Sequence, residues 1–213
     1  MRHILIVNAK GGCGKSTIAT NLAAYYANEG YMTVLADYDP QGSALSWLDE
    51  RPETAAPITG LAAYDEGLRR LPRNADFVIM DAPARSHGTE LTELVRHAET
   101  ILVPVLPSPI DIKSAADFIT ELLSRGKVAT RQAKVGLVAN RIMENTLIFD
   151  ELEEYLEKLR VPYLAALREA QNYIRAYQRG LGIHELPPYL AWPDWEQWEP
   201  IIEWLDSRRS RPR

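Results

Sequence analysis

The chain has 213 residues, of which 46% are hydrophobic and 25% are charged, with a formal net charge of −5. This composition is typical of one globular domain, and it excludes a protein that is basic throughout, so any DNA binding must come from a local patch. No apolar run approaches the ~20 residues of a membrane-spanning helix, no signal-peptide pattern is present, and the single cysteine excludes an intrachain disulfide. We expect a cytoplasmic domain over residues 1–206, followed by a basic, flexible tail at 207–213.

The first motif lies between a strand expected at 2–7 and a helix that ends before Gly30. It reads NAKGGCGKST at 8–17. A glycine-rich turn that opens a helix lets backbone N–H groups converge on a polyphosphate, and the helix dipole adds to the attraction. Lys15 would reach the β- and γ-phosphates, and the Ser16 hydroxyl would bind Mg²⁺. The alternative is a plain glycine turn. The residues predicted to bind the nucleotide are Gly11, Gly12, Cys13, Gly14, Lys15, Ser16 and Thr17.

Two further strands end in acidic residues. Residues 33–36 form a short apolar run before DYDPQGS at 37–43, where Asp37 and Asp39 point the same way if the strand continues. The alternative for this pair is a turn with two solvated aspartates. Residues 77–80 form another apolar strand that ends at Asp81, which is the Walker B arrangement, in which the carboxylate holds magnesium.

The rest of the chain alternates between strand and helix patterns. Residues 52–73 are weakly patterned, with a helix expected near 64–71. Beyond them, the expected strands are 101–106, 134–139 and 161–164, and the expected helices are 89–98, 115–123, 150–160, 167–180 and 195–207. This alternation predicts an α/β fold with a twisted, mostly parallel sheet flanked by helices on both faces. Because the motifs follow strand ends, they would meet at the edge where such sheets bind ligands.

These motifs together resemble the ParA/MinD family of partitioning and positioning ATPases. The loop carries a second lysine, in KGGCGKS at 10–16, which is similar to the family's deviant Walker A motif. DYDPQG at 37–42 and DAP at 81–83 resemble its other signatures, and PSP at 107–109 looks like a loop of small plasmid-type ParA proteins. The resemblance implies a P-loop NTPase that binds ATP and Mg²⁺.

The resemblance also implies roles for individual residues. Asp37 would join Ser16 and Asp81 around Mg²⁺, and Asp39 would orient the attacking water. Lys10 would reach the ATP of a partner subunit, so the catalytic residues would be Lys10, Lys15 and Asp39. Asn140, at the end of a strand, would pair with the adenine edge; its alternative is a helix N-cap or turn residue.

The implied activity is a switch. The protein would form a homodimer on ATP, bind non-specific DNA of the nucleoid, and be released when a cargo adaptor protein stimulates hydrolysis. Its cargo would be a plasmid, a chromosome or a protein organelle. Arg168, Arg175 and Arg179 fall at i, i+7 and i+11, which is one stripe of a helix, and they are candidate DNA contacts or a solvated face.

Two features leave alternatives open. Arg85 stands where the family commonly has another proline or glycine nearby, and it is either a surface residue or a contact for phosphates or a partner chain. The C-terminal segment holds Trp192, Trp195, Trp198 and Trp204. This segment either packs on the sheet or a partner, or binds membrane as in MinD-like ATPases. The interrupting acidic residues argue against membrane binding.

Overall fold

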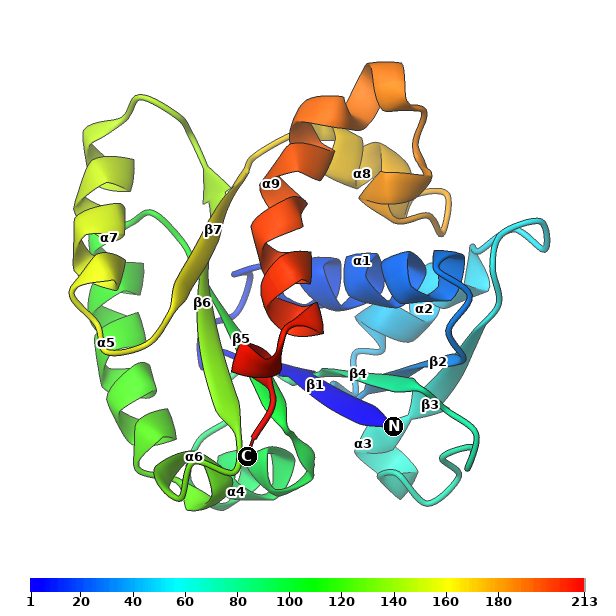
Figure 1. Cartoon of the computed structure of the whole chain (residues 1–213), viewed down its shortest axis with the longest axis horizontal. Coiled ribbons are helices and arrows are strands. Elements are labelled where there is room, and N and C mark those ends of the chain that lie inside the picture. The colour runs from blue at the N-terminus through cyan, green and yellow to red at the C-terminus, as the bar shows by residue number, and fades with distance from the viewer. Residues whose placement is uncertain (213) are drawn as a thin grey trace.

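The computed structural model describes residues 1–212. Within this range, one seven-stranded parallel sheet has the order β3-β2-β4-β1-β5-β6-β7 (Figure 1). The strands are β1 (Arg2–Ile6), β2 (Thr33–Asp37), β3 (Ile58–Ala62), β4 (Phe77–Asp81), β5 (Thr100–Val105), β6 (Lys134–Ile142) and β7 (Tyr163–Arg168). The predicted α/β class with a parallel sheet is confirmed.

Helices cover both faces of the sheet. One face carries α1, α2, α8 and α9, and the other carries α4, α5, α6 and α7 (Figure 1). The helices are α1 (Lys15–Asn28), α2 (Ser43–Asp49), α3 (Ala63–Glu66), α4 (Gly88–His97), α5 (Pro109–Leu123), α6 (Gly126–Ala129), α7 (Leu147–Glu157), α8 (Gln171–Tyr177) and α9 (Pro188–Asp206), with the 3₁₀ turns η1 (Ile183–Glu185) and η2 (Arg208–Ser210).

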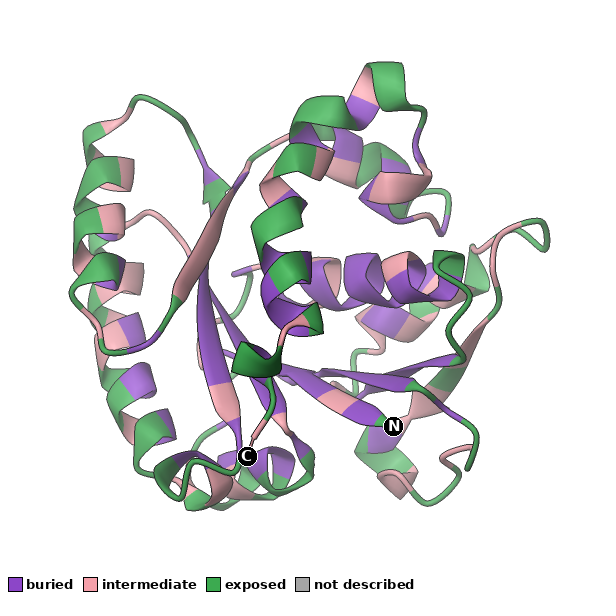
Figure 2. Cartoon of the chain, in the orientation of Figure 1, coloured by how far each residue is buried: buried purple, intermediate pink, exposed green. Residues whose placement is uncertain are grey.

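The central strands are apolar on both sides, because each side faces helices. In β1 and just beyond it, Leu5 and Val7 belong to one hydrophobic cluster, whereas Ile4 and Ile6 belong to the other. This is the two-residue alternation of a strand, and covering both faces turns an alternating pattern into a continuous apolar run. Figure 2 shows the result as a sheet that is buried at its centre.

Strand β3 and helix α2 were absent from the sequence-based expectation. β3 is an edge strand whose residues are only half-buried, so it lacks the apolar run of the central strands. Its Gly60 lets α2 pack closely, since a Cβ there would lie 2.8 Å from a Leu48 methyl carbon. The helix expected near 64–71 is the four-residue α3, Ala63–Glu66.

The C-terminal segment packs on the fold, so the expected flexible tail at 207–213 is wrong for its first part. Residues Arg208–Ser210 form η2, and Ser210 is fully buried. The buried guanidinium of Arg2 donates to Ser210 Oγ and to Thr100 Oγ1, both at 3.0 Å, and also to the carbonyl of Leu205. Hydrogen bonds to a buried arginine therefore hold the first strand and the chain end together. Arg213 lies outside the described residues.

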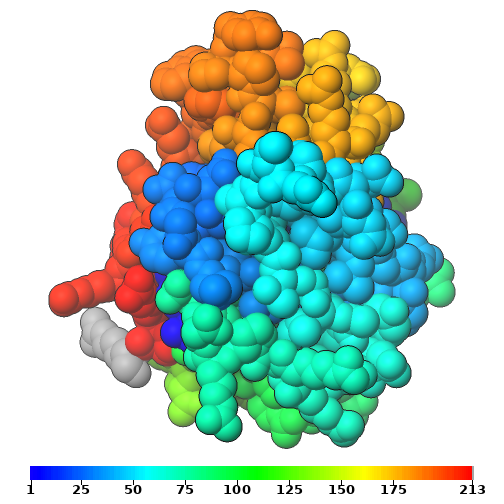
Figure 3. Space-filling model, turned by 90° about the vertical axis from the view of Figure 1, so that its right-hand side faces the viewer, coloured from blue at the N-terminus to red at the C-terminus, as the bar shows by residue number. Residues whose placement is uncertain are grey.

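A buried ion pair joins the residue that follows the C-cap of α2 to the 3₁₀ turn η1 before α9. Arg51 Nη2 lies 2.7 Å from Glu185 Oε1, and both side chains are almost fully buried. The other nitrogens of Arg51 donate to the carbonyls of Ala56 and Gly180 and to Glu185 Oε2, so the guanidinium is satisfied. In the space-filling view of Figure 3, the orange C-terminal segments lie against the blue and cyan segments.

We expect Arg51→Met to lower the free energy of unfolding by about 3–5 kcal/mol, because it leaves the Glu185 carboxylate buried without its charged partner. Urea denaturation measures this value. The matched control is Arg70→Met, which removes an exposed pair with Glu66 and should cost less than ~0.5 kcal/mol. A loss at Arg51 no larger than that of the control would contradict the assignment.

Candidate nucleotide site

The loop between β1 and α1 has the shape that a phosphate-binding turn needs. Gly14 is the N-cap of α1 with φ 90°, and Gly12 has φ 75°. A Cβ at Gly14 would lie 2.1 Å from Asn140 Nδ2, so only glycine fits. Asn140, near the end of β6, donates from Nδ2 to the Cys13 carbonyl at 2.8 Å. This hydrogen bond fixes the loop to β6, which is separated from β1 by β5 in the sheet.

The two lysines of the loop point to different partners. Lys15 is buried, and its Nζ donates to the Lys10 carbonyl at 3.1 Å, across the loop. Lys10 leaves the loop, and its Nζ lies 3.7 Å from Asp111 Oδ1 at the start of α5. Cys13 is buried between them, and burial raises the pKa of its thiol, which agrees with its interpretation as a small filler.

Asp81 is a buried carboxylate without a protein partner. It is fully buried, and neither of its oxygens accepts a hydrogen bond from any of residues 1–212. Burial raises its pKa to about 7, and the charge of Asp37 adds to the rise, whereas the Ser16 hydroxyl and the charge of Lys15 oppose it. Carboxylate and hydroxyl oxygens are the ligands that Mg²⁺ prefers. The donor set of Asp81 and Ser16 therefore fits that ion.

Asp37 and Asp39 have different surroundings. Asp37 is fully buried; its Oδ1 accepts from the Asp39 amide, and its Oδ2 accepts from the amides of Ala44 and Leu45. Burial raises its pKa, and these three N–H groups offset part of the rise. Asp37 thus organises the turn before α2, and its place around Mg²⁺ stays a prediction. Asp39 is partly exposed, accepts from the Gln41 amide at 3.0 Å, and faces the pocket.

A pocket of about 950 Å³ opens beside the loop. This volume is in the range of small-molecule sites. One half is built by the phosphate loop and the other by β7, α8 and Trp198 of α9. The predicted residues that line it are Gly11, Gly12, Gly14, Lys15, Ser16, Thr17, Asp39, Asn140 and Arg168. Sequence reasoning missed the walls made by Tyr173 and Trp198, because aromatic side chains carry no motif.

A family model for the CobQ/CobB/MinD/ParA nucleotide binding domain matches residues 4–183. The chain belongs to this family. The resemblance to ParA/MinD ATPases inferred from the motifs is therefore confirmed.

Two relatives are similar in sequence to different lengths of this chain. Maintenance of carboxysome distribution protein A (McdA) from Halothiobacillus neapolitanus is 30% identical over 189 residues, which is 86% of this chain and 87% of that protein. The chromosome-partitioning ATPase Soj from Thermus thermophilus is 35% identical over 127 residues, which is 54% of this chain and 51% of Soj.

Solved structures share the fold. Apo McdA from Cyanthece has a TM-score of 0.74 at 17% identity and covers 96% of this chain and 99% of that one. Cobyrinic acid a,c-diamide synthase from Mycobacterium smegmatis, solved with bound ADP and magnesium, has a TM-score of 0.70 at 18% identity and covers 100% and 98%.

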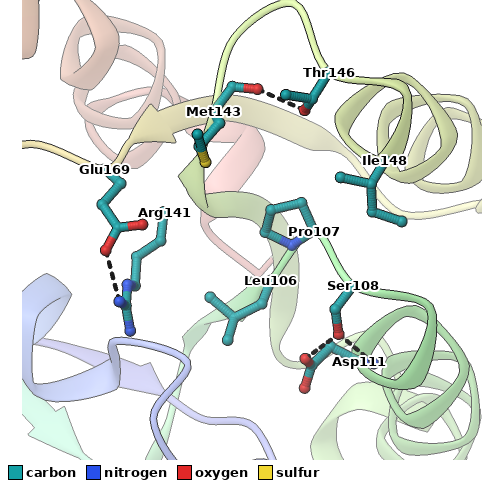
Figure 4. Close-up of a pocket in the computed structure, with 9 residues that line it drawn as sticks. All are labelled: Leu106, Pro107, Ser108, Asp111, Arg141, Met143, Thr146, Ile148 and Glu169. Atoms are coloured by element: carbon teal, nitrogen blue, oxygen red, sulfur yellow. Dashed lines mark hydrogen bonds and ion pairs between the residues drawn. The ribbon is translucent and has the colours of Figure 1, made fainter.

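A second, smaller pocket of about 330 Å³ adjoins the nucleotide pocket of this ParA/MinD-family chain (Figure 4). Arg141 and Glu169 line both pockets and form a 2.7 Å ion pair between them. Arg141 has φ 54° and is the extra residue of a β-bulge. Its neighbours Asn140 and Ile142 pair with the consecutive residues Leu167 and Arg168 of β7, which leaves Arg141 unpaired. A bulge of this kind re-aims a side chain, here towards the cleft.

The predicted arginine stripe is wrong as a single helix. Arg168 ends β7, whereas Arg175 lies in α8 and Arg179 follows it. Arg168 is paired with Asp194, and Arg175 and Arg179 are exposed. Arg85 is also exposed, with φ 65°, and its amide donates to the Ala9 carbonyl of the phosphate loop at 2.8 Å.

The tryptophan-rich segment lies in α9, which begins earlier than the expected 195–207. Trp198 and Trp204 are buried, and Trp195 donates to the Ile183 carbonyl at 2.7 Å. Trp192 alone among the four is more than half exposed. The segment therefore packs on the domain. None of the helices in the described part of the chain has the length and apolar character needed to cross a bilayer.

We expect Asp81→Asn to stabilise the nucleotide-free protein by about 1–3 kcal/mol at pH 8, because it removes a buried charge whose desolvation Ser16 and Lys15 offset only in part. The pKa of Asp81 in the folded protein, about 7, exceeds the ordinary aspartate pKa of 3.8, so the folded state binds more protons than the unfolded state between these pH values. The stability of the parent should therefore fall as pH rises from about 4 to 7, and that of the variant should fall less.

Urea denaturation at pH 6 and pH 8 measures both effects. Asp65→Asn, at an exposed position in α3, is the matched control and should change neither value. A variant less stable than the parent at pH 8 would show that Asp81 has a stabilising partner.

Proposed function

We propose that this chain is a Mg²⁺-dependent ATPase that dimerises on ATP, binds non-specific DNA as a dimer, and is released when an adaptor protein stimulates hydrolysis. The observation that carries the proposal is the divergence of the two lysines. Lys15 turns into its own loop, whereas Lys10 leaves it towards Asp111 with its side chain 38% exposed. A partly exposed lysine beside, but not lining, its own nucleotide pocket is available to a second subunit.

Each residue of the site would have its own role in ATP hydrolysis. Backbone N–H groups of the loop and the Nζ of Lys15 would bind the phosphates, and Asp39 would orient the attacking water. Mg²⁺, held by Ser16 and Asp81, would neutralise charge on the β- and γ-phosphates. Asn140 Nδ2 is bound to the loop, which leaves its Oδ1 to accept from an adenine amino group. Lys10 of each chain would add a cation at the partner's γ-phosphate.

The cargo function rests on the relatives. The names of McdA and Soj describe distribution of carboxysomes and partitioning of chromosomes. We propose that this chain positions a cargo on the nucleoid in the same way, with exposed Arg175 and Arg179 as DNA contacts. The alternative is MinD-like membrane binding, for which the half-exposed Trp192 and the 90% exposed Tyr189 at the start of α9 are the relevant side chains.

A gel shift on random-sequence DNA, beside liposome sedimentation, separates the two functions. We expect DNA retention with ATP and not with ADP, and no ATP-dependent pelleting with lipid. Retention should weaken steeply with salt, because phosphate contacts release counterions. Pelleting with lipid and no retention on DNA would overturn the proposal.

We expect Lys10→Ala to bind ATP like the parent but to lose ATP-dependent dimerisation, with turnover reduced at least about tenfold, because one cation at the transition state is missing. Size-exclusion chromatography and phosphate release measure these effects. Lys158→Ala is the control, since Lys158 is an exposed lysine at the end of α7 whose ion pair is with Glu154 of that helix. Unchanged dimerisation and turnover in Lys10→Ala would exclude the cross-subunit role.

We expect Asp39→Ala to bind ATP and to remain dimeric, because the water is no longer oriented while the phosphate contacts persist. Turnover should fall at least about a hundredfold, within the range of a general acid–base contribution. Normal turnover would remove the assignment of Asp39.

A further inference from the structure

The carboxylate of Asp194, in α9, is fully buried and reaches the wall of the nucleotide pocket. Its Oδ1 accepts from Arg168 Nε at 2.7 Å, and its Oδ2 accepts from Asn172 Nδ2 at 2.7 Å. A charge without water is tolerated only when it is paired and hydrogen-bonded. Asp194 meets both conditions through side chains of the β7–α8 junction.

The same junction is held to α9 at two further points. The Arg168 amide donates to Gln197 Oε1 at 2.8 Å, and Trp198 Nε1 donates to the Tyr173 hydroxyl at 2.9 Å. Arg168, Tyr173 and Trp198 all line the nucleotide pocket. The C-terminal helix therefore fixes the pocket wall opposite the phosphate loop.

Only one of the three guanidinium nitrogens of Arg168 is used by this network. Its Nη1 and Nη2 donate no hydrogen bond to any residue of 1–212, and the side chain keeps 33% of its surface. Replacing a buried ion pair by apolar residues is often neutral or stabilising, so stability alone does not account for the pair. An arginine anchored through Nε presents a planar face and two donor groups to the cavity.

The position of Arg168 in the pocket indicates which half of a bound nucleotide, the phosphates or the nucleoside, it would contact. The phosphates belong at the loop, from Gly11 to Thr17, at the other side of the pocket. Arg168 follows Leu167, which is paired in the sheet with Asn140. We propose that Arg168 binds the nucleoside half of the nucleotide and that Asp194 of α9 is its positioning residue. This inference rests on the nucleotide site of the proposed function, and not on DNA binding.

Arg168→Lys separates the structural role from the binding role. The lysine Nζ can replace the bond to Asp194, so the melting temperature should stay within about 2 °C of the parent. It cannot replace the two Nη donors, so the Kd for MgATP should rise about tenfold, as expected for the loss of one charged hydrogen bond. Arg160→Lys, at an exposed position outside both pockets, is the control.

A competition assay with inorganic tripolyphosphate locates the contact. Arg168→Lys should bind tripolyphosphate like the parent, because this probe has no nucleoside. If the melting temperature is kept, either an unchanged Kd for MgATP or an equal loss for tripolyphosphate overturns the proposal. Failure of the parent to bind MgATP would instead contradict the proposed function.

Asp194→Asn tests the coupling even if Arg168→Lys is poorly folded. This variant keeps the shape of the side chain and leaves Arg168 whole, so it should weaken MgATP binding while tripolyphosphate binding stays unchanged. The double variant should bind MgATP no more weakly than Arg168→Lys alone, because both changes act on one contact. Additive losses, or no loss for Asp194→Asn, would show that Asp194 does not position Arg168.

Discussion

The parallel pairing of β1 with β4, and of β4 with β2, is the constraint on which the site depends. It places Ile6 beside Asp81 and Asp37 beside Asp81, so three strand ends stop at one level. The phosphate loop leaves β1 at that level, so Asp81, which the sequence marks as an acidic strand end, lies beside the loop. A register slip of one residue would turn Asp81 to the other face of the sheet.

The site is not the arrangement that stability alone would select. The carboxylate of Asp81 is buried without a partner, and both Arg85 and Arg141 hold backbone angles that favour glycine. Strain and unsatisfied groups of this kind collect at functional sites and persist because surrounding structure enforces them.

Helix α9 belongs both to the hydrophobic core and to the wall of the pocket. Its buried tryptophans belong to the hydrophobic cluster that includes α1, and Trp198 lines the pocket. Asp194 and Gln197 of the same helix hold Arg168 of the pocket wall. A helix that is largely used for packing has little apolar surface left for a lipid bilayer. The tryptophan-rich composition is thus explained by packing inside the domain, while Trp192 stays at the surface.

The sequence by itself determined the α/β class, the phosphate loop and the acidic strand ends, because these depend on residue spacing within one element or turn. It did not determine β3, whose half-buried edge position gives only a weak pattern, or the boundary between β7 and α8. Tertiary structure alone decided that Asn140 binds the Cys13 carbonyl and that Arg168 meets Asp194 and the nucleotide pocket rather than forming a stripe with Arg175. These partners are brought together by strand order and helix packing, and neither can be read from local spacing.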